Sequence, residues 1–152
     1  MSSESPERNP ALAPLKPLIG SWRVTLSHAS FVDDPDAILS GTASLEWLYD
    51  AFVVMRSGFD AGPPQSWSVI GRNESLDAYS VLYYDARGVS RIYSMDFDGT
   101  MWTLLREDPD FYQRFRGRLS EDGNTITAAW EKSDDRGATW EHDFDLTYVR
   151  AT

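Results

Sequence analysis

Residues 141–145 read Glu-His-Asp-Phe-Asp, which places one imidazole among three carboxylates, the groups that proteins use for metal binding and acid–base catalysis. The surrounding TWEHDFDLTYVR alternates apolar and polar residues, a pattern typical of a β-strand. Because consecutive strand residues point to opposite faces, the imidazole and its two neighbouring carboxylates cannot converge on one ion. The only other histidine is His28, and there is no HExxH pattern. We therefore expect no metal site, with the three carboxylates facing water and His142 facing inward.

Other catalytic constellations are missing from the sequence. The chain contains no cysteine, which excludes disulfides, thiolate nucleophiles and cysteine-based zinc or iron–sulfur sites. There is no G-x-S-x-G elbow and no glycine-rich phosphate loop, and no pair of carboxylates stands out for glycoside hydrolysis. These observations favour a non-enzymatic protein and assign no reaction type.

Three arginines, Arg56, Arg72 and Arg106, lie within expected strands. A guanidinium inside a barrel must be paired or must meet an anionic ligand, because burying it alone is costly. Either each arginine points outward or bonds an acid such as Glu46 or Asp96, or at least one binds a carboxylate, as in a fatty-acid-type pocket. Both alternatives stay open at this point.

The elements that must position these residues are strands. Asp/Asn-Gly turn signals separate many of the segments of period two, and such pairs permit the positive backbone angles of tight hairpins. A long meander leaves exposed edges unless it closes, so the sequence predicts an all-β, closed antiparallel up-and-down barrel of about ten strands; a sandwich is the competitor. The expected strands are 22–30, 41–49, 51–59, 66–73, 78–84, 89–97, 100–106, 111–119, 125–132 and 139–148.

The rest of the chain predicts one domain with a short start. Residues 1–10 are polar and proline-containing, and we expect a disordered tail there, followed by a single barrel domain over residues 11–152. Pro14 and Pro17 limit the first apolar segment to one or two short helical turns. The start lacks the features of a secretory signal and no apolar run has transmembrane length, which predicts a cytoplasmic protein. The net charge of −10 disfavours nucleic acid and anionic membranes as partners.

A barrel of this size commonly encloses one small ligand, and the many aromatic residues suit an apolar cavity with a few orienting polar groups. We expect non-catalytic binding of a small hydrophobic or amphipathic molecule in the lumen. The alternative is a ligand-free interaction module, recognisable by a filled barrel and an apolar patch on its exterior. The expected ligand-binding residues are Arg56, Tyr83, Gln113, Trp130, Trp140, His142 and Phe144.

The segment LIGSW resembles the G-x-W signature that opens calycin barrels, the superfamily of lipocalins, fatty-acid-binding proteins and nitrobindins. Nearly everything after the tail, from GTASLEWLYDAFVVMRS to the final LTYVR, is similar to uncharacterised bacterial lipocalin-like proteins that form a domain family of unknown function. The resemblance implies that Trp22 packs across one end of the barrel. Many members of the superfamily form dimers, so it also implies a homodimer as a partner to test.

Nitrobindin is the informative relative within this superfamily, because it holds ferric haem through a histidine near its C-terminus. The resemblance therefore implies haem as an alternative cofactor, with His142 as its ligand and no other metal. The sequence departs from nitrobindin, since Gly20-Ser21-Trp22 continues as Arg23-Val24-Thr25 in place of a longer glycine-rich stretch. The segment around His142 also differs from the one that surrounds the nitrobindin haem ligand.

Overall fold

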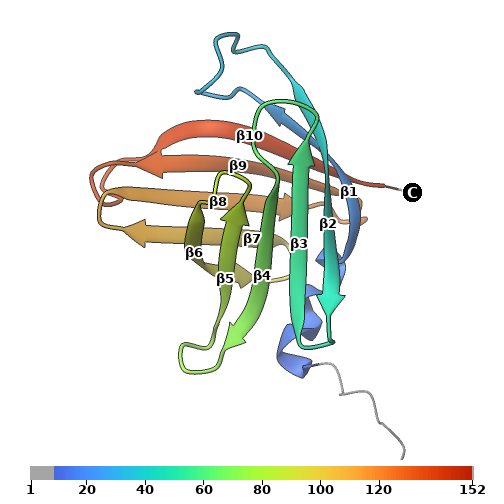
Figure 1. The fold of residues 1–152 in the computed structure, drawn as a ribbon. Helices are drawn as coiled ribbons and strands as arrows, with labels where there is room; N and C mark the ends of the chain where they lie inside the picture. The colour runs from blue at the N-terminus through green and yellow to red at the C-terminus, as the bar shows by residue number, and fades with distance from the viewer. Residues whose placement is uncertain (1–8, 152) are drawn as a thin grey trace, which may run out of the picture.

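Ten antiparallel strands close into one barrel in the order β1-β10-β9-β8-β7-β6-β5-β4-β3-β2 (Figure 1). The computed structural model describes residues 9–151. A 3₁₀-helix, η1, precedes the strands. The bounds are η1 Pro10–Leu18, β1 Gly20–Ser27, β2 Leu39–Leu48, β3 Phe52–Phe59, β4 Ser66–Asn73, β5 Ala78–Asp85, β6 Ser90–Phe97, β7 Met101–Asp108, β8 Phe111–Leu119, β9 Thr125–Ser133 and β10 Glu141–Arg150.

The predicted all-β barrel with a short helical start is confirmed, and each expected strand corresponds to one observed strand. Four tight turns contain Gly88, Gly99, Gly123 and Gly137, whose φ angles of 85°, 99°, 74° and 83° are left-handed, as the turn signals predicted. The predicted tail falls mainly on residues 1–8, which lie outside the described residues. Its last two residues are part of the fold, because Asn9 caps η1 and donates its backbone N–H to the Asp50 carbonyl at 2.8 Å.

The helix η1 covers one end of the barrel, which we call the closed end (Figure 1). Its leucines Leu12, Leu15 and Leu18 recur every third residue, matching the three-residue turn of a 3₁₀-helix, and all three are buried. Trp22 follows on β1 with its ring buried and its Nε1 donating to the Leu18 carbonyl at 3.0 Å. This is the position that the superfamily resemblance implied for Trp22.

The two halves of the lumen differ in how tightly their inward side chains are packed. At the closed end most inward residues are buried, among them Val24, Val53, Ile70 and Trp102. The opposite end, which we call the mouth, is where β1 ends and β2 begins, with the loop 28–38 between them. Inward side chains near the mouth are partly exposed: Met55, Ser57, Ser66, Ser68, Tyr83, Arg91, Gln113, Trp130, Lys132 and Phe144. Inward side chains are therefore more accessible to solvent near the mouth than at the closed end.

Candidate ligand-binding site

Four of the seven predicted ligand-binding residues point into the mouth half of the lumen. Tyr83 lies opposite Ser68 on β4, and Gln113 lies opposite Arg106 on β7 and Lys132 on β9. Trp130 and Phe144 are direct cross-strand partners, with ring centroids 6.4 Å apart. These four residues come from four different strands, β5, β8, β9 and β10, and the closure of the barrel brings them together. Their contact with a ligand stays a prediction.

The prediction that Arg56 lies in the lumen or at its rim is wrong. Its neighbours in register, Ser44 on β2 and Trp67 on β4, share the outer face, and its side chain is 53% exposed. The Nη1 atom lies 3.5 Å from a carboxylate oxygen of Glu46, an exposed pair of small energetic value. The alternation of residues in β3 does not indicate which face points inward, because Val53 and Val54 lie on opposite faces and are both buried. Glu46 was one of the acids predicted as an outward partner.

The prediction that His142 and Trp140 face inward is also wrong, and a β-bulge is the reason. His142 pairs with Glu131, whereas Phe144 pairs with Trp130, so Asp143 is one extra residue between them. The extra residue reverses the alternation, and His142 therefore falls on the outer face with Glu131. Trp140 precedes the strand and lies on the exterior, with the guanidinium of Arg114 4.1 Å from its ring centroid.

The carboxylates around His142 do not all face water. Asp145 lies on the outer face, where its two oxygens bond the rings of His28 and His142 at 2.8 Å each. Asp143 is only 14% exposed, which corrects the prediction for this residue: its carboxylate accepts from the Ser30 hydroxyl at 2.5 Å and lies 3.8 Å from Lys132 Nζ. Residues 9–151 contain no group of three or more His, Asp or Glu side chains arranged to hold a metal ion.

These positions decide whether the chain fits a haem. An axial ligand inside the barrel requires an imidazole directed into the lumen. Both histidines of the sequence bond Asp145 on the exterior, and their side chains are 66% and 47% exposed for His28 and His142. The residues present therefore do not fit a haem held in the lumen through His142.

One wall of the mouth half is aromatic, and the facing strands carry several small inward side chains. Tyr83 packs edge-on to Tyr93, Tyr93 to Trp130, and Phe115 lies beneath Trp130 at 5.3 Å. Near the mouth, Ala43, Ser57 and Ser66 are paired in register, and Ser68 lies opposite Met55 and Tyr83; we call these four positions the small-residue wall. Larger inward residues of the same strands, Leu39, Met55 and Phe59, pack against the core beside them. Phe31, from the loop at the mouth, packs against Phe144 with centroids 5.5 Å apart.

Arg91, which is not among the predicted ligand-binding residues, faces inward near the mouth. Its Nη1 donates to Gln113 Oε1 at 3.1 Å, and the Tyr93 hydroxyl donates to the same oxygen at 3.1 Å. Burial raises the pKa of the Tyr93 hydroxyl, while the charge of Arg91 acts in the opposite direction. The signal was available, because RIYSMDF places Arg91 two residues before Tyr93 and four before Met95, on the same face.

Several other charged groups near the mouth form ion pairs. Asp85 is buried and accepts from the Tyr83 hydroxyl and from Arg87 Nη2, both at 2.8 Å. The bonds from Arg87, reinforced by Tyr83, hold the pKa of Asp85 far below its usual range despite the opposing effect of burial. Burial and the Asp85 carboxylate together raise the pKa of Tyr83.

Arg106, one of the three arginines considered above, faces inward and bonds Asp108 at 2.6 Å. Arg72 pairs with Asp77 near the closed end.

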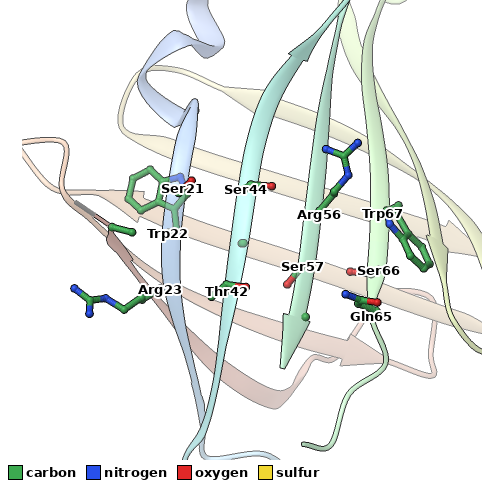
Figure 2. A pocket seen from close by; sticks show the side chains of 13 residues that line it. Ser21, Trp22, Arg23, Thr42, Ser44, Arg56, Ser57, Gln65, Ser66 and Trp67 are labelled. Carbon is green, nitrogen blue, oxygen red and sulfur yellow. The ribbon is translucent and has the colours of Figure 1, made fainter. Parts of the chain in front are cut away.

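A second candidate site is a trough of about 320 Å³ on the outside of β1 to β4 (Figure 2). It is open, its lining presents both polar and apolar surface, and Arg56 is part of it. An exterior apolar row lies beside it on β3 to β6, where Val54, Val69, Leu82 and Ile92 are neighbours in register. The outward side chains that line the trough are Ser21, Arg23, Thr42, Ser44, Arg56 and Trp67.

The comparisons with known proteins define the fold. No protein-family model matches the sequence, and no curated protein matches it. The structure is similar to the crystal structure of Rv2717c from M. tuberculosis, with a TM-score of 0.65 and 11% sequence identity over 96% of this chain and 100% of that chain. Identity this low shows a shared fold alone. The closed ten-stranded barrel fits a calycin-like fold, as the resemblance implied, and membership of the lipocalin-like family stays a prediction.

No helix between residues 9 and 151 has both the length and the apolar character needed to cross a membrane.

Proposed function

We propose that this protein binds a small, partly hydrophobic molecule in the mouth half of its lumen and does not catalyse a reaction. The observation that carries this proposal is the contrast between the two halves of the barrel. Most inward side chains are buried at the closed end, whereas Tyr83, Gln113, Trp130 and Phe144 face inward near the mouth and are still partly exposed. Apolar walls with a few convergent polar groups are the usual composition of a small-molecule site.

The exterior trough supports this function less well. Most of its outward side chains are exposed and polar, and the trough is open to solvent. Small molecules gain most of their affinity when most of their surface is buried, which a lumen provides and an open trough does not. The lumen is therefore the better location for a partly hydrophobic ligand.

The proposal can be tested with the neutral fluorophore N-phenyl-1-naphthylamine, whose emission increases in an apolar environment. We expect saturable binding to the wild-type protein. Ser68→Phe places a ring on the small-residue wall, opposite Met55 and Tyr83, and we expect it to weaken binding by about tenfold or more. Native mass spectrometry of the purified protein would show in parallel any ligand that co-purifies.

Two matched variants separate the lumen from the exterior. Ser94→Phe adds the same ring on the outer face of β6, and Ile92→Ser removes the most exposed member of the apolar row that the described chain carries there. Both should leave the affinity for the fluorophore within about twofold. If Ile92→Ser weakens binding and Ser68→Phe does not, the fluorophore binds the exterior row, and the interaction-module hypothesis replaces the proposal.

A further inference from the structure

Arg91 is the inward cation whose charge the protein does not neutralise. It lies opposite Tyr83 in register, and its hydrogen-bond partner is the neutral amide oxygen of Gln113. Within the described chain, Arg91 takes part in no ion pair with an Asp or Glu side chain. A partly buried guanidinium without a carboxylate partner is unfavourable unless an anion reaches it.

Arg91 differs from the other inward cations near the mouth, because those are paired with acids. Arg106 pairs with Asp108 at 2.6 Å and Lys132 lies 3.8 Å from Asp143. The inward carboxylate of Asp85 is likewise paired, with Arg87 at 2.8 Å. One guanidinium without an acidic partner can pair with one carboxylate of a ligand.

The surroundings of Arg91 also hold polar groups that an anion would require. Gln113 Oε1 accepts from both Arg91 and the Tyr93 hydroxyl, which fixes the guanidinium on the β6 and β8 side of the lumen. Arg106 lies directly opposite Gln113 on β7, and its Nε atom is buried without a hydrogen-bond partner. A buried donor that lacks a partner is costly and marks a place where a ligand oxygen or a water is expected.

Apolar surface begins next to this polar cluster. Tyr93 packs edge-on against Trp130 with ring centroids 5.6 Å apart, and the Trp130 ring in turn lies 6.4 Å from the Phe144 ring. A molecule with a carboxylate at Arg91 would therefore extend its apolar part along Trp130 and Phe144 toward the small-residue wall.

We propose that Arg91 is the anion-binding residue of the lumen and selects amphipathic molecules that carry a single carboxylate. Gln113 acts as a positioning residue that holds the guanidinium, and Arg106 Nε supplies a second donor. This inference rests on the proposed function, because it names the chemical class of the ligand for the same site.

The test compares two probes that differ in one charge, 11-(dansylamino)undecanoic acid and its methyl ester, by fluorescence titration at pH 7. We expect the wild-type protein to bind the acid about tenfold more tightly than the ester, the size of one charge-assisted hydrogen bond. In Arg91→Gln the two affinities should become equal through weaker binding of the acid, with the ester unchanged to within about twofold. Arg91→Lys, which keeps the charge and loses the fork of donors, should retain part of the preference.

Arg118→Gln is the matched control, because Arg118 lies on the outer face of β8 and is exposed. It removes the same charge and should leave the preference of the wild type unchanged, with circular dichroism confirming that each variant is folded. A preference for the acid that survives in Arg91→Gln overturns the inference. Equal binding of both probes by the wild type also overturns it while leaving lumen binding intact. Failure of the wild type to bind either probe refutes the proposed function itself.

Discussion

Arg150 connects η1 to the closed end of the barrel through hydrogen bonds. Replacing it should lower the free energy of unfolding more than replacing any other surface-accessible arginine of the described chain. Its Nη1 donates to the Ile19 carbonyl at 2.8 Å, and its Nη2 donates to the Pro17 carbonyl at 2.8 Å. Nε and Nη2 also reach the Gly123 carbonyl, at 3.2 and 3.0 Å. The guanidinium lies 4.2 Å from the ring centroid of Trp22.

The expected loss follows from these contacts. A hydrogen bond from a charged donor contributes about 1.5–3 kcal/mol, and the lower value applies here because Arg150 is partly exposed. The two short bonds then give about 3 kcal/mol, and the contact with the Trp22 ring adds about 0.5 kcal/mol. The longer bonds share one carbonyl and add little. We therefore expect Arg150→Met, which keeps the apolar stem, to lower the free energy of unfolding by about 3–4 kcal/mol.

Urea denaturation followed by tryptophan fluorescence measures this loss. With an m-value of about 2 kcal/mol/M, the midpoint should fall by about 1.5–2 M. Arg150→Lys retains one donor site and should lose about half as much, whereas Arg118→Gln on the outer face should change the free energy by less than about 0.5 kcal/mol. A loss below about 1 kcal/mol in Arg150→Met would refute the argument. So would unchanged hydrogen exchange of the Trp22 indole N–H, since Arg150 is argued to act through η1.

Three further predictions concern other parts of the barrel. Asp85→Asn should cost about 2–3 kcal/mol at pH 7 in thermal denaturation, because it removes a buried carboxylate that accepts from Arg87 and from the Tyr83 hydroxyl. The pKa of Asp85 is lowered in the folded protein, so this stability is present above the unfolded pKa of about 3.9 and is lost as the pH falls toward the folded pKa. The difference from the wild type should therefore shrink at pH 3. Gly41→Ala should destabilise by about 2 kcal/mol or more in urea denaturation, since its Cβ would lie 2.2 Å from the Gly58 carbonyl oxygen; a neutral effect would mean that β2 and β3 can separate there at little cost. His142→Ala should leave the affinity for N-phenyl-1-naphthylamine within about twofold because His142 lies outside the lumen, and a large loss in titration would place it at the site after all.

Period-two alternation predicted the inward positions where a strand is regular and has one polar face. Gln113 and Trp130 lie in such stretches and face inward. Tyr83 and Phe144 also face inward, although the strand of Tyr83 has apolar Leu82 on its outer face and Phe144 follows the bulge. Arg56 lies in a strand with apolar residues on both faces, so the sequence around it does not indicate which face points into the barrel.

The bulge at Asp143 could not be predicted from its own strand. Its backbone carbonyl accepts from the Ser30 N–H at 2.7 Å, and its carboxylate accepts from the Ser30 hydroxyl. Both partners come from the loop after β1, which becomes a neighbour only when β1 and β10 close the barrel. The extra residue is thus stabilised by contacts with residues that are distant in sequence, and no local sequence pattern predicts these contacts. The direction of His142 and Trp140 follows from that bulge and was missed for the same reason.

Arg91 and Arg150 lie on inward positions at opposite ends of the barrel and illustrate the difference between the two ends. Arg150 donates to three backbone carbonyls, whereas Arg91 donates to one side-chain amide and has no anionic partner in the described chain. Replacing Arg91 by Met should therefore change the free energy of unfolding by less than about 0.5 kcal/mol, or raise it, because the substitution removes an uncompensated charge. Urea denaturation of Arg91→Met beside Arg150→Met measures the contrast. A loss of about 2 kcal/mol or more in Arg91→Met would mean that the guanidinium supports the fold through Gln113, and its role as a site held ready for an anion would have to be abandoned.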